Sequence, residues 1–505
     1  MIKRLNLSGH RRRRPEWLSG NEPSDGSLFS RRRPLQKLTV LIDAELLTKQ
    51  RHNPPAGRPD PMQILSGLLE HPLVRLLRYS DEGPPPTAIP HEHARGAPVF
   101  QGWAVPKEHH PQSHEWSVYY PTDAGFTVSG VSGNFIDVAS NDTQTDVYRE
   151  LDPLIARTRR RADALAAQVA GQALQADLYV TERPYLHRAT WSIADGVTLC
   201  HPREALALLS LYFRTQGEFL VAPRYAFNRG LFFWVGTREL LPEAWRWFTA
   251  CVQHANASGN DKLMLLGGSL LQRVDRALEA RDAIHIALNQ AQNNDLQDDA
   301  LANLDVLLVL LMGAVDVSAR VAHQTLGLPP SKEYRAAWQD TKPKGWLCQV
   351  RAKSPDLAAV LNVGTQDQHA LTILRLLRNS VHGAALQGVA VLRGSRRIES
   401  LVGLPVDDEA TLLSAMDVLG GQANWGVRPS ARGRSFVDPG ILADRLFVAT
   451  VGLLNNLMAK TPVEILPHVR ISPTDAQPPT EPDADIRMDP FSPWVRESIR
   501  LQLGF

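Results

Sequence analysis

The stretch LRLLRNSVHG at residues 374–383 decides the fold expected for the second half of the chain. On a helix that turns 100° per residue, Arg375, Arg378 and His382 lie within about 60° of one another, whereas the leucines face other directions. The stretch therefore predicts a helix with an apolar face that ends at Gly383, a residue type common at helix termini. It also predicts two guanidinium groups and one imidazole on a shared face, a combination that suits the binding of a phosphate group.

Long helical patterns extend on both sides of this stretch. They occupy residues 242–255, 263–290, 300–326, 331–339, 368–382 and 441–460. The third of them is apolar on nearly every side, which predicts a central helix, and Gly313 within it allows a neighbour to pack closely. Asp316 and Arg320 can pair on one face, and with His323 they form either a second polar cluster facing the first or structural pairs. Residues 240–465 are therefore predicted to be an all-α bundle.

The first half of the chain has a different pattern. Residues 38–43, LTVLID, are apolar and β-branched and predict a buried strand, residues 147–176 predict a long helix, and residues 176–186 predict a strand followed by a turn. Shorter strands are expected at residues 118–120, 126–129, 134–138 and 231–235. This alternation predicts an α/β domain over residues 38–235 with a Pro- and His-rich insertion, in which ligands gather outside the carboxyl ends of parallel strands.

This first region resembles a PIN-type nuclease domain. In that family an aspartate ends the first strand, other acids come from the middle of the fold, and a strand before a Thr-acid-Arg turn supplies the last. Asp43 matches the first position, and the stretch with Asp177 and Glu182 resembles the last, with Glu182 where aspartate is usual. The candidates for the middle position are Asp142, Asp146 and Glu150. The resemblance implies that such acids hold Mg²⁺ or Mn²⁺, hard cations that take oxygen ligands. In the alternative, Asp43 and Asp177 cap elements of a Rossmann-like domain without catalysis.

Residues 263–386 resemble the HEPN superfamily of helical bundle proteins, especially its larger Apea-like relatives. The resemblance rests on a buried helix with Gly-Ala-x-Asp-x-x-Ala-Arg, a tryptophan-containing connection, and Leu-Arg-Asn-x-x-His-Gly at residues 377–383. Active members are metal-independent ribonucleases whose motif is an arginine, usually a polar residue, and a histidine after four to six intervening positions. Arg378 and His382 have three residues between them, one short of that motif. Arg375 fits the spacing with six but is not followed by a polar residue, so the catalytic arginine is either Arg378 or Arg375.

The resemblance assigns a role to each polar residue of the stretch. His382 is the general acid or base, Arg378 or Arg375 binds the charge that develops on the phosphate, and Asn379 orients either group. Because one motif carries a single imidazole, two chains are expected to pair as a homodimer, and no cofactor is expected at this site. The chain is thus expected to cleave or bind RNA in a defence or toxin role. The alternative is a non-catalytic interaction or sensor protein in which the same residues stabilise a helix end.

Composition and charge limit the remaining possibilities. With 505 residues, 43% hydrophobic and 21% charged, the chain suits two or three globular domains without a membrane span. Its three scattered cysteines form neither a disulfide framework nor a CxxC metal pair, which favours a reducing cytoplasm. Residues 1–37 hold ten Lys/Arg and three Asp/Glu, a net charge of +7, and predict a basic disordered tail that binds nucleic acid or simply stays solvated.

Two further segments complete the predictions. Five histidines lie in one Pro-rich region, namely His91, His93, His109, His110 and His114. Without cysteines or a familiar spacing, these histidines are expected to be solvated rather than metal-binding. Residues 466–505 are expected to form a linker and a C-terminal tail, in which residues 493–505 form a short amphipathic helix. That helix is expected to dock on the body of the protein or on a protein partner.

Overall fold

The chain forms two compact units. The computed structural model describes residues 1–4, 37–48, 59–81, 102–110, 115–120, 126–131, 135–143, 145, 147–188, 197–222, 225–290, 294–340, 342–383, 385–393, 397–429, 434–478 and 489–505. The N-terminal unit contains Lys3–Ala226 and Gly504, and the helical unit contains Met1–Ile2, Phe227–Leu503 and Phe505. The division at Ala226 precedes the predicted end of the first domain at residue 235.

Several predicted features lie outside the described residues. They include most of the basic tail, most of the Pro- and His-rich insertion, and His91, His93, His114 and Asp146. His109 and His110 are the last two residues of strand β3 (Gly102–His110). The predictions made for the outlying residues therefore stay predictions.

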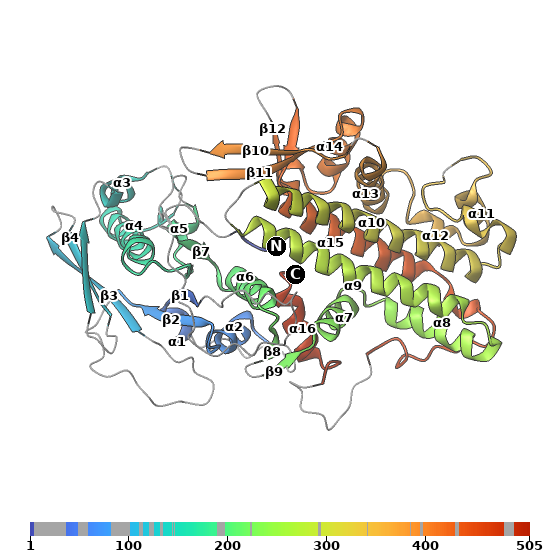
Figure 1. The fold of residues 1–505 in the computed structure, drawn as a ribbon, viewed down its shortest axis with the longest axis horizontal. Coiled ribbons are helices and arrows are strands. Elements are labelled where there is room, and N and C mark those ends of the chain that lie inside the picture. Colours follow the sequence, from blue (N-terminus) through green and yellow to red (C-terminus); the bar gives the residue numbers. More distant parts are fainter. Residues whose placement is uncertain are drawn as a thin grey trace, which may run out of the picture. The chain divides into compact units, whose positions relative to one another are not determined.

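Seven strands of the N-terminal unit form one sheet in the order β5-β4-β3-β2-β1-β6-β7 (Figure 1). They are β1 Leu38–Asp43, β2 Val74–Tyr79, β3 Gly102–His110, β4 Glu115–Tyr120, β5 Phe126–Val131, β6 Leu178–Val180 and β7 Thr198–Cys200. Strands β3, β2, β1, β6 and β7 run parallel, and β4 and β5 add an antiparallel pair beside β3. All six residues of β1 are buried, as expected for a central parallel strand covered on both faces. The parallel α/β sheet predicted for this region is confirmed.

Helices connect these parallel strands. They are α1 Ala44–Thr48, α2 Pro61–Leu69, α3 Phe135–Asn141, α4 Pro153–Gln168, α5 Pro184–Arg188 and α6 Pro202–Thr215. Helix α4 begins sharply because the Asp152 carboxylate accepts hydrogen bonds from two backbone N–H groups of its first turn. The strand expected at residues 134–138 is wrong, since residues 135–138 belong to α3. Because β1, β2 and β6 are parallel, the residues that follow each of them meet at one edge of the sheet.

Long helices dominate the second unit. They are α7 Arg229–Leu240, α8 Ala244–Ser258, α9 Lys262–Leu288, α10 Asn294–Thr325, α11 Trp346–Lys353, α12 Pro355–Ala359, α13 Gln366–His382, α14 Glu409–Val418, α15 Pro439–Lys460 and α16 Pro493–Gln502. Helices α9 and α10 pack along each other, and α15 lies against both (Figure 1). Helix α13 packs on α10, α14 and α15. The predicted helical character of this region is confirmed, and residues 331–339 form only a short 3₁₀ turn, Pro330–Arg335.

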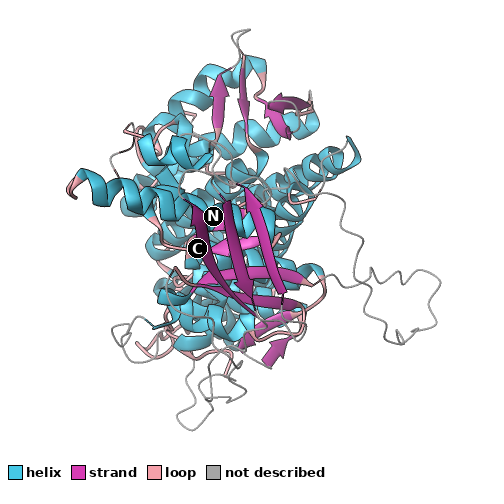
Figure 2. Ribbon diagram, turned by 90° about the vertical axis from the view of Figure 1, so that its left-hand side faces the viewer, coloured by secondary structure: helices cyan, strands magenta, loops and turns pink. Residues whose placement is uncertain are grey.

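Two expectations about this second unit are wrong. It is not all-α, because a four-stranded sheet in the order β10-β11-β13-β12 accompanies the helices; Figure 2 draws both sheets in magenta. Its strands are β10 Gly388–Arg393, β11 Arg397–Gly403, β12 Val427–Pro429 and β13 Ser435–Val437. The apolar run at residues 231–235 is helical and belongs to α7, because the Asn228 side chain caps the helix and accepts the Leu231 N–H. The preceding two-stranded sheet consists of β8 Phe219–Ala222 and β9 Tyr225–Phe227.

A buried polar network holds both described chain ends in the helical unit. The Arg281 guanidinium donates to Asp444 Oδ1 at 2.5 Å and to the Leu503 carbonyl at 2.8 Å, and the Ile2 N–H donates to Asp444 Oδ2 at 3.3 Å. Helix α16 packs on α7, so the predicted docking of the C-terminal helix on the body is confirmed. A separate protein partner for this tail stays a prediction.

Within the described part of this unit, two helices are long and apolar enough to cross a membrane, by length and composition alone. The segments are Asp295–Thr325 and Pro439–Ile465, and 50% and 61% of their most apolar windows are buried inside the structure. Such burial is the pattern of core helices, which share length and composition with membrane spans.

Candidate functional site

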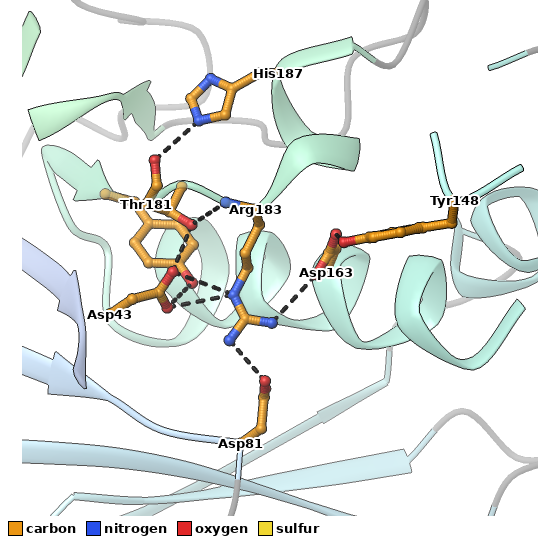
Figure 3. Close-up of polar contacts among 8 residues, drawn as sticks. Asp43, Asp81, Tyr148, Asp163, Thr181, Arg183 and His187 are labelled. Atoms are coloured by element: carbon orange, nitrogen blue, oxygen red, sulfur yellow. Dashed lines mark hydrogen bonds and ion pairs between the residues drawn. The ribbon is translucent and has the colours of Figure 1, made fainter. Parts of the chain in front are cut away.

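Three carboxylates surround one guanidinium group at the carboxyl edge of the large sheet. We call Asp43, Asp81, Asp163 and Arg183 the carboxylate ring (Figure 3). Arg183 Nε lies 3.3 Å from both oxygens of Asp43, Nη2 lies 2.7 Å from Asp81 Oδ2, and Nη1 lies 3.2 Å from Asp163 Oδ1. Asp43 ends β1, Asp81 follows β2, Asp163 belongs to α4, and Arg183 follows β6. Four separate elements thus direct their charged groups to one point.

Asp43 has donors for both of its oxygens. The Tyr179 hydroxyl donates to Oδ1 at 2.7 Å, and the Thr181 hydroxyl donates to Oδ2 at 2.5 Å. Thr181 also accepts the Arg183 backbone N–H at 3.1 Å, which fixes the turn after β6 and directs the arginine back over the strand ends. Asp43 is therefore a buried, fully hydrogen-bonded carboxylate, the condition under which burying a charge is tolerated.

Asp163 is the second buried member of the ring. Burial raises the pKa of its carboxyl to about 6, although the Arg183 charge and a hydrogen bond from Tyr148 oppose the rise. The Tyr148 hydroxyl donates to Asp163 Oδ2 at 2.9 Å. Tyr148 has a φ of 66°, a left-handed conformation that is costly for an aromatic residue. A strained backbone conformation at Tyr148 thus accompanies the placement of its hydroxyl beside Asp163.

The acids expected to join Asp43 lie elsewhere. Asp177 precedes β6 and accepts the Thr39 N–H at 2.8 Å, so it lies at the amino edge of the sheet, opposite Asp43. Glu182 is exposed, and Arg183 forms ion pairs with Asp43, Asp81 and Asp163. Two of the middle candidates also lie outside the ring: the Asp142 carboxylate accepts from the Tyr185 hydroxyl at 3.0 Å, and Glu150 is exposed. Asp81 and Asp163, which take these places, were not predicted.

The carboxylate ring does not fit a divalent metal ion. Such ions need convergent oxygens that are free to coordinate, whereas the oxygens of Asp43 and Asp163 accept hydrogen bonds and a guanidinium group occupies the centre. Within the part of the chain that the structure describes, no group of three His, Cys, Asp or Glu side chains is arranged to hold a metal. The structure does not bring Asp177 to Asp43, and the Mg²⁺ or Mn²⁺ that the PIN resemblance implies for Asp43, Asp177 and Glu182 stays a prediction.

Helix α13 has the two faces that its sequence predicts. Its apolar face, which includes Leu374 and Leu377, is buried, Arg375 and Arg378 are half-buried, and His382 is exposed at the last turn. The Thr365 side chain caps the first turn by accepting the Gln368 N–H. Asn379 is exposed one turn before the helix ends. The imidazole predicted as the catalytic group is thus accessible and not sealed beneath the bundle.

Asp316 on α10 lies in the field of three arginines from three helices. Burial raises the pKa of its carboxyl, and Arg378, Arg320 and Arg273 oppose the rise. Gly313 has a second role here, because a Cβ at that position would lie 2.5 Å from Arg273 Nη1. The glycine thus lets the Arg273 guanidinium lie across α10, which agrees with the close packing predicted for this residue.

We call Asp316, its three arginines, Arg375 and His382 the arginine face. Among the described residues, none of its four arginines forms an ion pair or a hydrogen bond, and Arg273 Nε is buried without a partner. Four guanidinium groups against one carboxylate leave a surplus of three positive charges. A surplus of unpaired guanidinium donors is suited to an anion with several oxygens, such as a phosphate diester.

His323 does not belong to the arginine face. Its side chain is 1% exposed, its Nε2 lies 3.0 Å from the Pro329 carbonyl, and its Nδ1 accepts the Trp346 indole N–H at 3.0 Å. These two contacts define one neutral tautomer, with the proton on Nε2. Of the predicted second polar cluster of Asp316, Arg320 and His323, Asp316 lies in the field of Arg320 and of Arg378 on α13, whereas His323 holds the Trp346 side chain and the Pro329 carbonyl in place. The predicted Asp316–Arg320 pair is not closed as an ion pair within the described residues.

Comparisons with known proteins provide no support for or against these site assignments. No family model matches the chain, and no curated protein or solved structure matches it. The resemblances to PIN-type and HEPN proteins accordingly stay predictions that rest on the quoted motifs.

Proposed function

We propose that the helical unit binds RNA at the arginine face and cleaves the phosphodiester backbone there without a metal ion. The observation that carries the proposal is the set of unpaired guanidinium groups around Asp316, one of which, Arg378, belongs to the helix that ends in the exposed imidazole of His382. A polyanion is the partner that such a surface favours, because each guanidinium that contacts a phosphate releases counterions condensed on the nucleic acid. The proposal agrees with the HEPN resemblance of the same residues.

The chemistry follows from the groups that the face offers. His382 as general base removes the proton of a ribose 2′-hydroxyl, and the resulting oxygen attacks the adjacent phosphorus. The bond to the 5′ oxygen breaks, that oxygen takes up a proton, and the product is a 2′,3′-cyclic phosphate. Arg378, or Arg375 in its place, stabilises the extra negative charge of the transition state with paired N–H donors, and Asn379 orients either group. RNA is the substrate because DNA lacks the 2′-hydroxyl.

Two chains are proposed to complete one site. A single α13 carries one suitable imidazole, whereas cleavage uses one group to remove a proton and another to supply one. A homodimer would place two His382 side chains on one substrate. The cytoplasmic location and the defence or toxin role belong to the same proposal and rest on the resemblance alone.

A second candidate is a non-catalytic interaction or sensor protein. It is favoured by exposed apolar residues on α10, where Val306 and Val309 are 48% and 41% exposed, as at a surface that meets another protein. In this alternative the arginine face binds RNA or a protein partner without cutting it.

The test is cleavage of a mixed RNA pool by purified full-length protein, in Mg²⁺ and in EDTA. The variants are His382→Ala and the control His369→Ala, a half-buried histidine on a different face of α13. The proposal predicts cleavage in EDTA that falls roughly 10²–10⁴-fold in His382→Ala and persists in His369→Ala. Cleavage that requires Mg²⁺ and ignores His382→Ala would contradict it, and binding without cleavage would favour the second candidate.

A further inference from the structure

We propose that Arg183 is the built-in cation of the N-terminal unit: its guanidinium takes the place between Asp43, Asp81 and Asp163 that a divalent metal ion would need. At the carboxyl edge of the sheet, the three carboxylates are then neutralised by an arginine of the chain and not by a metal ion. It becomes a divalent cation site only when the Arg183 side chain is removed. This inference concerns a different unit from the proposed ribonuclease site and does not depend on it.

The contacts of Arg183 show how fully it fills the position. Its Nε, Nη1 and Nη2 each face a different carboxylate of the ring, at 3.3, 3.2 and 2.7 Å. The guanidinium carbon lies 5.2 Å from the centroid of the buried Tyr79 ring, within the range of a cation–π contact. The arginine side chain is 14% exposed. A second cation would have to enter against this charge, and the oxygens of Asp43 and Asp163 that it would meet already accept hydrogen bonds.

The hydroxyl donors around the ring add to the exclusion. Tyr179 and Thr181 donate to Asp43, and Tyr148 donates to Asp163. Each donated proton points at a carboxylate oxygen from which a metal would need a lone pair. Asp81 is the most exposed member, with 36% of its side chain exposed, and one carboxylate makes a weak site alone.

Removing the guanidinium would change this balance. The three carboxylates would then face a gap between them, where previously one positive charge compensated them. Three converging carboxylates without a counter-charge attract a hard divalent cation, and an oxygen that accepts one hydroxyl proton keeps a second lone pair, which Arg183 no longer faces. A small neutral residue at position 183 should therefore create a cation site from residues already in place.

The experiment compares Mn²⁺ binding to the full-length wild type, Asp43→Asn, Arg183→Ser, and Arg183→Ser combined with Asp43→Asn. Free Mn²⁺ is followed by electron paramagnetic resonance, and thermal unfolding is measured with and without Mn²⁺. The wild type should show no saturable Mn²⁺ binding that depends on Asp43. Arg183→Ser should bind about one Mn²⁺ and gain roughly 5 °C or more at saturating metal, and the Asp43→Asn change should abolish both effects.

Two controls keep the result decisive. Arg183→Lys keeps the positive charge and should bind no Mn²⁺, and Arg183→Gln replaces Arg183→Ser if the latter is not recovered folded. Wild-type Mn²⁺ binding that Asp43→Asn removes would overturn the proposal, because the ring would then hold a metal despite its arginine. A folded Arg183→Ser or Arg183→Gln protein that gains no Mn²⁺ site would overturn it as well.

Discussion

The carboxylate ring and the arginine face combine the same two chemical groups in opposite proportions. The ring has one guanidinium among three carboxylates, and each of the three nitrogens of Arg183 contacts a different carboxylate. The arginine face has three guanidinium groups in the field of the single carboxylate of Asp316 and a fourth, that of Arg375, on the same helix as Arg378, with no ion pair closed among the described residues. A guanidinium group that the chain itself satisfies contributes to the stability of its own unit. One that the chain leaves unsatisfied is available to a ligand.

The largest effect expected from this comparison is on stability. Arg183→Met would leave buried carboxylates without their counter-charge and should lower the free energy of unfolding by roughly 3–5 kcal/mol. Arg378→Met, the matched change on the arginine face, breaks no ion pair and should change it by less than about 1 kcal/mol. Denaturant unfolding of both variants checks the pair. Equal losses would break the distinction between the two sites.

The stability of the N-terminal unit should depend on pH through the Asp163 carboxyl. The pKa of the Asp163 carboxyl is raised from 3.8 to about 6, so between these values the folded chain binds more protons than the unfolded chain. Its contribution is therefore fully present below pH 4 and is lost as the pH rises through 6, with a slope of up to about 1.4 kcal/mol per pH unit.

Asp163→Asn removes this titration. The difference in unfolding free energy between wild type and Asp163→Asn should thus change between pH 4 and pH 7, in the direction of a relative loss for the wild type as the pH rises. Urea unfolding at several pH values measures it. Parallel pH curves for the two proteins, or a difference of opposite sign, would contradict the raised pKa.

A smaller effect is expected from the strained tyrosine. Tyr148→Phe removes the hydrogen bond to Asp163 and should lower the free energy of unfolding by about 1 kcal/mol at pH 8. Because that hydrogen bond lowers the pKa of the Asp163 carboxyl, its loss should also move the pH window upward. If the pH range over which stability changes were the same in Tyr148→Phe and wild type, the Tyr148 hydroxyl would not stabilise the ionised Asp163 carboxylate.

The sequence predicts the strands and helices that carry the two sites better than it predicts which side chains meet in them. The apolar run that ends at Asp43 identifies the central strand, and the spacing of Arg375, Arg378 and His382 identifies a helix with one polar face, because both depend on local periodicity. Asp163 was missed because it lies inside a helix whose pattern does not mark it. Asp81 was missed because only the parallel pairing of β1 with β2 brings it beside Asp43.

Other errors have equally specific causes. The turn that contains Arg183 was predicted, but the direction of its side chain depends on contacts with three other elements. The run at residues 231–235 suits a buried strand and a buried helix equally, and the Asn228 cap together with packing on α9 and α16 decides for the helix. Strands β12 and β13 span three residues each, too few for a recognisable alternation.

The most direct test of the central claim is the salt dependence of RNA binding by the helical unit's arginines. Full-length wild type, Arg378→Gln and Arg229→Gln are titrated with single-stranded RNA by fluorescence anisotropy at several salt concentrations. Arg229 is the matched control, because it already pairs with Glu279 at 2.6 Å. Arg378→Gln should weaken binding and lower the magnitude of the slope of log K against log salt by roughly 1, with Arg229→Gln near wild type. Equal slopes for all three proteins would contradict the central claim.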